Sequence, residues 1–234
     1  MEQWQKLLSI LIAFLFIASG SASAADPVAA YLYGFNGTRD RQVRIDASTR
    51  ALTTITYAHH EIHGGGSYST SYAITTAATS GHQSGIYMLT PATKEIHLVV
   101  EFSASVAANY SICEGITLAA DTGTDGVAIY NRDRNSTKTS EIKDNATPQV
   151  ANKVSTLSQA ELAGDGSWAC GTTIRTAPLE AGSGPKPAGG ASRGSQEYIL
   201  KKSTAYAFII TNTVATANKH DILLDWYEHT PQED

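Results

Sequence analysis

The sequence predicts an all-β fold, a single antiparallel β-sandwich of jelly-roll type. Short segments in which apolar and polar residues alternate recur along the chain, which is the pattern of half-buried strands. Gly-, Asp- and Ser-rich turn signals separate these segments at 64–67, 122–126 and 163–167. Few stretches show a helical period. Short strands joined by regular turns favour a sandwich or jelly roll over a mixed fold.

The N-terminus is predicted to lie outside this domain. Lys6 precedes an apolar run of about a dozen residues, which is short for a membrane span of roughly 20 residues, and "SASA" follows at Ser21–Ala24. We therefore expect residues 1–24 to be a signal peptide or hydrophobic leader, cut after Ala24. Glu2 offsets the usual basic charge, so an uncleaved anchor and a misplaced start codon remain alternatives. Residues 25–41 are expected to form an N-terminal arm.

The β domain is predicted to span residues 42–234, and its strands can be followed in order. The segments that alternate are "QVRIDAS" at 42–48, "RALTTITYAHHEIH" at 50–63, "YSTSYAITT" at 68–76, "SGIYMLTP" at 84–91, "EIHLVVEFSAS" at 95–105, "YSICEGITL" at 110–118, "EYILKK" at 197–202, "AYAFIITN" at 205–212 and "HDILLDWYEH" at 220–229. In 95–102 the apolar residues occupy every second position, which predicts one buried and one polar face. The Gly-rich stretch 180–195 is predicted to be a surface loop, or a segment ordered by a partner subunit.

The phrase "HHEIH" raises the question of a metal site. The zinc motif H-E-x-x-H needs ligands four apart on a helix, and here the second histidine comes one residue too early. On the expected strand, His59, Glu61 and His63 would share one side. The sequence nominates no further ligand, so we expect no bound metal; those three residues are the candidates if one binds. Histidines that pack or contact a subunit are the favoured interpretation.

Other catalytic patterns are missing from the sequence. It has no G-x-S-x-G elbow, no G-K-[ST] phosphate loop, no C-x-x-C pair and no recognisable pair of catalytic carboxylates. We therefore predict a protein that is not an enzyme and has no cofactor. The formal net charge of −5 argues against a basic surface for nucleic acid.

Two further features leave alternatives open. Cys113 and Cys170 could form a disulfide if the chain is exported, or could be two free buried thiols. The segment "YNRDRNSTKTS" at 130–140 could bind phosphate or sugar. The favoured interpretation is a polar loop or an interface, with Arg132 and Arg134 as contact residues.

Several sequence segments resemble those of a known protein family. "VRIDASTRALTTITYAHHEIHGGGSY", "YNRDRNSTKTS", "GGASRGSQEYILKKSTAYAFIITN" and "ILLDWYEHTPQED" are similar, in this order, to segments of β-rich virion structural proteins of tailed bacteriophages. The similarity runs from about Gln42 to the C-terminus. It implies a non-enzymatic particle component, such as a capsid decoration or head-fibre protein, without assigned catalytic residues. The leader departs from this family, whose members assemble in the cytoplasm.

The resemblance also implies partners. A virion role predicts a homo-oligomer, with a trimer favoured, in contact with other virion or surface-assembly proteins. Candidate interface residues are Arg132, Arg134, Arg193, Trp226 and Tyr227. The expected location is the virion or the cell exterior. The main alternative is an exported glycan-binding, adhesive or filament-forming module; exposed aromatics beside "YNRDRN" would favour it, and buried ones would count against it. A metal-dependent hydrolase centred on His59, Glu61 and His63 is the third hypothesis.

Overall fold

The computed structural model describes residues 33–35, 40–42, 57–74, 80–159, 162, 168–180, 186–187 and 197–230. The leader and Arg193 lie outside these ranges. The chain divides into two compact units, Met1–Thr54 and Ile55–Asp234. The sequence-based domain boundary at Gln42 therefore falls inside the first unit. In that unit, β1 (Tyr33–Phe35) and β2 (Asp40–Gln42) form an antiparallel pair.

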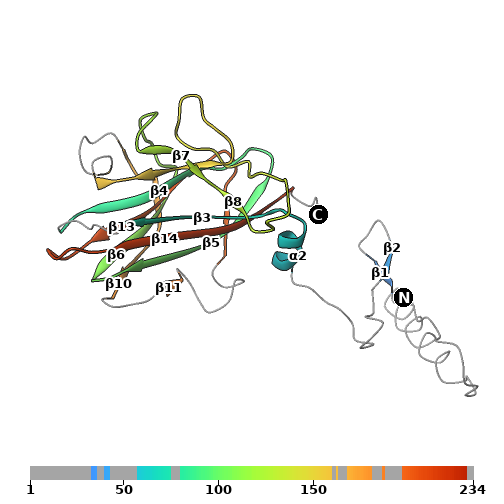
Figure 1. The fold of residues 1–234 in the computed structure, drawn as a ribbon, viewed down its shortest axis with the longest axis horizontal. Helices are drawn as coiled ribbons and strands as arrows, with labels where there is room; N and C mark the ends of the chain where they lie inside the picture. The colour runs from blue at the N-terminus through green and yellow to red at the C-terminus, as the bar shows by residue number, and fades with distance from the viewer. Residues whose placement is uncertain are drawn as a thin grey trace, which may run out of the picture. The chain divides into compact units, whose positions relative to one another are not determined.

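The second unit is a sandwich of two antiparallel sheets (Figure 1). The first sheet contains β3 (Ser67–Ile74), β5 (Glu95–Ala104), β8 (Tyr130–Asn131), β11 (Lys186–Pro187), β12 (Tyr198–Leu200) and β14 (His220–His229). The second sheet contains β4 (Gln83–Leu89), β6 (Ala108–Glu114), β7 (Thr124–Ala128), β9 (Lys153–Leu157), β10 (Thr172–Leu179) and β13 (Ala205–Asn212). This confirms the predicted all-β sandwich.

The strand order is that of a jelly roll. Along the chain, β3, β4, β5 and β6 alternate between the two sheets. The last strands then insert between them: β14 pairs with both β3 and β5, and β13 pairs with both β4 and β6. Beyond these, β12 borders β5 and β10 borders β6. The two interleaved four-strand sets are the double Greek key of this architecture.

The main core lies between the sheets, where alternation points the apolar residues inward. Ile96, Leu98, Val100 and Phe102 of β5 are buried, as predicted. The larger set from both sheets that packs with them includes Tyr68, Ile86, Met88, Tyr110, Ile112, Tyr206, Phe208, Ile210, Ile222, Leu224 and Trp226. Each such side chain contributes about 1.5–3 kcal/mol when fully buried. The inward faces of β5 and β14 therefore fix the position of whatever lies on their outward faces.

A second, smaller core covers the other face of the second sheet. Tyr87, Ile209 and Leu157 pack there with residues of the long insertion between β6 and β10. Cys113 is the last residue but one of β6 and Cys170 precedes β10, and their Cα atoms lie 5.4 Å apart in a disulfide. The bond joins the two ends of the insertion that carries β7, β8 and β9.

The structure corrects the prediction of a strand over "YAHHEIH". Tyr57–His63 is the helix α2. Gly66 N–H donates to the Glu61 carbonyl (2.8 Å) and Gly65 N–H to the Ile62 carbonyl (3.0 Å), which is a Schellman ending. Gly65 has φ +69°, a conformation that favours glycine. The three glycines thus end a helix, and the same signal was readable in the sequence.

Candidate functional site

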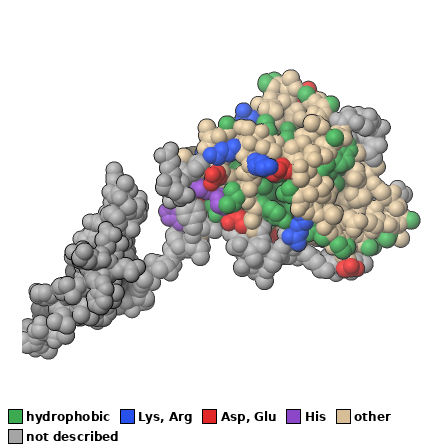
Figure 2. Space-filling model, turned by 180° about the vertical axis from the view of Figure 1, so that it is seen from behind, with side chains coloured by type: hydrophobic (Ala, Val, Ile, Leu, Met, Phe, Trp, Pro, Cys, Tyr) green, Lys and Arg blue, Asp and Glu red, His purple; other side chains and the backbone are tan. Residues whose placement is uncertain are grey.

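Three of the segments singled out in the sequence, "HHEIHGGG", "YNRDRNSTKTS" and "DWYEH", meet at one end of the sandwich. The Gly64–Gly66 turn receives the 130–140 loop: Asn131 Nδ2 donates to the Gly65 carbonyl (2.9 Å) and Lys138 Nζ to the Gly64 carbonyl (2.7 Å). The backbone N–H of Glu228, near the end of β14, donates to the Gly66 carbonyl (2.9 Å). Figure 2 shows histidines beside acidic and basic side chains toward one end of the visible face. This end is the candidate functional region.

A buried carboxylate holds this end together. The Glu228 side chain has no exposed surface and accepts hydrogen bonds from Trp226 Nε1 (3.1 Å), the Glu141 N–H (3.1 Å to Oε2) and the Ser140 hydroxyl. Lys94 Nζ lies 3.5 Å from Glu228 Oε2 and 2.9 Å from Glu141 Oε1. We call these five residues the Glu228 network. Its donors satisfy both carboxylate oxygens, as a buried charge requires.

The electrostatics of the Glu228 network favour fixed charges. Burial opposes the charge on Lys94, but hydrogen bonds and attraction from Glu141 and Glu228 outweigh it and raise the Lys94 pKa. Hydrogen bonds from Thr93 and Lys94 lower the Glu141 pKa. Burial, with the nearby charges of Glu228 and Glu141, raises the pKa of Tyr68 well above its usual value. These groups therefore keep one ionisation state at neutral pH, which suits a structural role.

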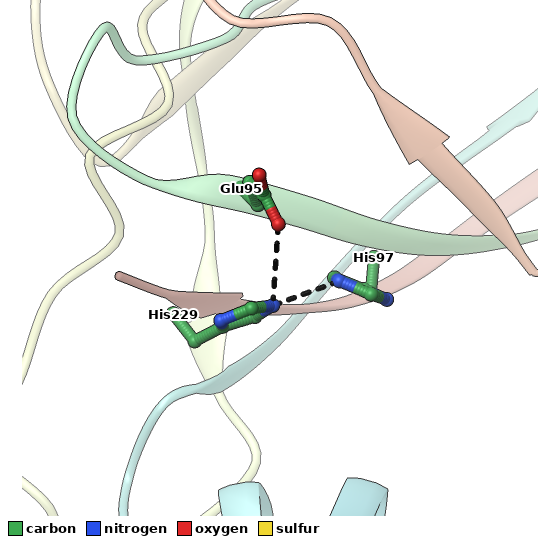
Figure 3. A group of neighbouring side chains, drawn as sticks. All are labelled: Glu95, His97 and His229. Carbon is green, nitrogen blue, oxygen red and sulfur yellow. Dashed lines mark hydrogen bonds and ion pairs between the residues drawn. The ribbon is translucent and has the colours of Figure 1, made fainter. Parts of the chain in front are cut away.

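The outward face of the same strand ends carries a second cluster. In the β5–β14 ladder His97 lies opposite Tyr227, and Glu95 lies opposite His229. Figure 3 shows the two imidazoles and the carboxylate converging. His97 Nε2 is 2.8 Å from His229 Nε2, and His229 Nε2 is 3.8 Å from Glu95 Oε2. We call Glu95, His97 and His229 the His97–His229 cluster.

Neighbouring groups orient both rings of this cluster. Tyr227 Oη lies 3.0 Å from His97 Nδ1, and the two rings stack with centroids 4.6 Å apart. Glu197 Oε2 lies 3.5 Å from His97 Nδ1. His229 Nδ1 lies 2.9 Å from the Thr230 carbonyl. All three members of the cluster are partly buried, so each ring is held in place and still reaches solvent.

The histidines singled out in the sequence are arranged differently. Helix α2 brings the rings of His59 and His63 to 4.7 Å between centroids, and both residues are exposed. Glu61 turns instead toward Gly66, where a Cβ atom would meet its Oε2 at 2.6 Å. Because His59, Glu61 and His63 sit on a helix and not on a strand, they do not share one side as expected.

The contact residues proposed from the sequence fall into an exposed pair and a buried pair. Arg132 is exposed, with Nη1 3.9 Å from Asp225 Oδ2, and the Arg134 guanidinium lies 5.5 Å from the centre of the exposed Tyr130 ring. Trp226, an interface candidate from the sequence, is fully buried in the core of this chain. Tyr227 is also buried, beneath His97. The alternation of β14 decides this: Trp226 points between the sheets, where its indole packs with Tyr68.

A hydroxyl–imidazole pair elsewhere has the spacing of a nucleophile and its base. Ser84 Oγ lies 2.7 Å from His220 Nδ1, but both residues are buried in the core. His220 Nε2 has no hydrogen-bond partner among the described residues, so no third group orients the ring. A surface pocket of about 450 Å³ is lined by Tyr87, Leu118, Ala120 and 145–149, and none of these described residues carries a charge. Neither feature assembles a catalytic arrangement.

Sequence reasoning missed the His97–His229 cluster. It did place His97 on the polar face of the segment 95–102. What it could not show is that His229, far along the chain, pairs beside Glu95, because strand pairing depends on the whole jelly-roll topology.

No known protein family, curated protein or solved structure matches this chain. Within the described parts of the chain, no helix is both long enough and apolar enough to cross a bilayer. The chemistry of the candidate region therefore follows from its own residues.

Proposed function

We propose that this chain is a non-enzymatic structural component of a particle surface, of the phage capsid-decoration kind that its phrases resemble. The observation that carries the proposal is that three of these sequence segments come together in the fold. "HHEIHGGG", "NRDRNS" and "DWYEH" contribute to one hydrogen-bonded assembly around Glu228. Their polar residues close an end of the jelly roll, and a fully satisfied buried polar network of this kind makes the structure rigid.

One side of the sandwich supports association with a second copy. There β10 borders the second sheet and β12 lies beyond β5 in the first. Ile174, at a bulge in β10, is 38% exposed and Ile199 of β12 is 65% exposed. Arg175 Nη1, 3.4 Å from Tyr198 Oη, links the two strands. Sheet edges that carry exposed apolar side chains favour pairing with a neighbour, and we propose a homotrimer built through this side.

The disulfide supports a location outside the cytoplasm. Such bonds persist in oxidising compartments and on virion or cell surfaces. Together with the leader expected at 1–24, the Cys113–Cys170 bond favours an exported protein or one exposed on a released particle. Mass spectrometry of the natural protein without reductant should find the Cys113–Cys170 cross-linked peptide and a mature N-terminus after Ala24. An intact Met1 would contradict cleavage.

The assembly proposal is tested by the mass of the purified protein in solution. Light scattering should show a trimer, and the double variant Ile174→Asp/Ile199→Asp should be monomeric, because two charges would be buried at the contact. Val150→Asp is the matched control, since Val150 is 46% exposed at a different site. A wild-type protein that stays monomeric at high concentration would contradict the trimer.

Glycan binding is a second candidate, favoured by one observation. Tyr130, in the "YNRDRN" loop, is 56% exposed and lies beside Arg134. Aromatic faces next to polar side chains suit sugar rings. The burial of Trp226 and Tyr227 counts against this candidate. A glycan array should give a specific signal that Tyr130→Phe keeps and Tyr130→Ala loses. An array without signal, or a signal unchanged in Tyr130→Ala, would reject it.

A further inference from the structure

We propose that Glu95, His97 and His229 bind a divalent transition-metal ion, with Zn²⁺ as the best-fitting one. The site lies on the outward face of β5 and β14. It is independent of the trimer and glycan proposals, and it involves none of the histidines of the "HHEIH" phrase.

The positions of the ligand atoms fit an ion. Candidate donor atoms of the three residues all lie within 4.8 Å of one another. Zn²⁺ binds imidazole nitrogen at about 2.0–2.1 Å, so two nitrogens on a tetrahedral ion lie about 3.3 Å apart. The two Nε2 atoms, now 2.8 Å apart, need to separate only slightly to admit it. Glu95 Oε2, 3.8 Å from His229 Nε2, is within reach as the third ligand.

Hydrogen bonds prepare both rings as ligands. The Thr230 carbonyl can only accept, so the neutral form of His229 carries its proton on Nδ1 and presents the lone pair of Nε2. The Tyr227 hydroxyl donates to Glu197 Oε2 (3.4 Å) and therefore accepts from Nδ1–H of His97. His97 then also presents its Nε2 lone pair. Metal-binding histidines are held by the same kind of second hydrogen bond.

The facing lone pairs are the strongest argument for a cation. In the neutral rings with both protons on Nδ1, the two Nε2 lone pairs face each other at 2.8 Å and repel. A cation between them removes that repulsion. The carboxylates of Glu95 and Glu197 add negative charge around the same point, against one exposed Lys202, whose Nζ is 4.0 Å from Glu95 Oε1.

The ligand set selects the ion. Two imidazoles with one carboxylate suit Zn²⁺ and its neighbours, whereas Ca²⁺ and Mg²⁺ prefer oxygen-only sites. Three protein ligands leave one position of a tetrahedron for water, and all three side chains are only partly buried. Because the ligands stand on directly paired strands, the backbone already holds them in place.

The test is a titration of the full chain, purified without a polyhistidine tag and stripped with a chelator. Calorimetry with ZnCl₂ should show one ion bound per chain. His97→Ala or His229→Ala should weaken binding at least about 100-fold, and Glu197→Gln about 10-fold through the loss of its support to His97. Co²⁺ in place of Zn²⁺ should give the visible absorption of a tetrahedral ion.

The matched control is the double variant His59→Ala/His63→Ala, which removes two nearby histidines and should keep full affinity. Circular dichroism checks that each variant is folded, and His97→Gln with His229→Gln repeats the test with smaller changes in shape. Absence of Zn²⁺ binding by the wild type would overturn the proposal. So would binding that survives in the folded His97 and His229 variants, or that is lost in the control.

Discussion

Glu228 and His229 are neighbours in the sequence, yet their side chains lie on opposite faces of β14, in different surroundings. Glu228 points between the sheets, where Ser140, Glu141, Trp226 and Lys94 surround its carboxylate. His229 points outward, where one ring nitrogen faces another across 2.8 Å. The alternation of one strand thus separates a polar group that holds the fold from a polar group placed to bind.

The two positions should differ sharply in what their removal costs. A buried carboxylate that is deleted leaves its hydrogen-bond donors without partners and away from water. A partly exposed histidine that is deleted leaves groups that water can reach. Substitutions at Glu228, His220 and His229 test this difference.

The largest effect is expected for Glu228→Ala. It leaves Trp226 Nε1 and the Glu141 N–H unpaired and removes one of the two carboxylates beside Lys94, so it should lower the free energy of unfolding by about 3–5 kcal/mol. Urea denaturation measures the change. Glu101→Ala, on the outward face of β5, is the control and should cost less than about 0.5 kcal/mol. Similar losses of stability in the two variants would show that the buried Glu228 carboxylate matters no more than an outward-facing one.

His220, at the other end of β14, extends the comparison to pH. Burial, and then the nearby His82, lower the His220 pKa from 6.5 to about 4. Between these values the unfolded chain binds a proton that the folded chain refuses. Stability is therefore fully present above pH 6.5 and falls as the pH drops toward 4, by about 2–3 kcal/mol from this group.

Denaturation midpoints at pH 7 and pH 4.5 test the His220 prediction, with His220→Asn as the reference. Asparagine keeps a polar atom near Ser84 but has no proton to gain, so the variant should lose less stability than the wild type over this range. Parallel pH curves for the two proteins would show that His220 is not the responsible group.

The smallest effect is expected for His229→Ala in metal-free protein. It removes a partly exposed ring, so the free energy of unfolding should change by less than about 1 kcal/mol. With excess Zn²⁺ only the wild type should gain stability, because an ion bound to the native state alone stabilises it. The proposed difference between the two positions would be wrong if His229→Ala lost as much stability as Glu228→Ala. It would also be wrong if Zn²⁺ did not stabilise the wild type.

More of the fold than of the candidate region could be predicted from the sequence. Alternation in 95–102 correctly gave the buried face of β5, and the turn signals correctly suggested many short strands. The helix over Tyr57–His63 was missed because its residues were read with the β-branched segment before them. Gly65 and Gly66 were read as a turn, although their spacing suits a helix ending.

The all-β class and the buried face of β5 follow from the sequence, because both depend on a period of two that neighbouring residues carry. Which strands pair depends on the tertiary structure. It placed Glu228 among donors from distant loops and set His229 beside Glu95 and His97. Strand register depends on the packing of both sheets at once, and no local pattern encodes a contact between residues that are more than a hundred positions apart.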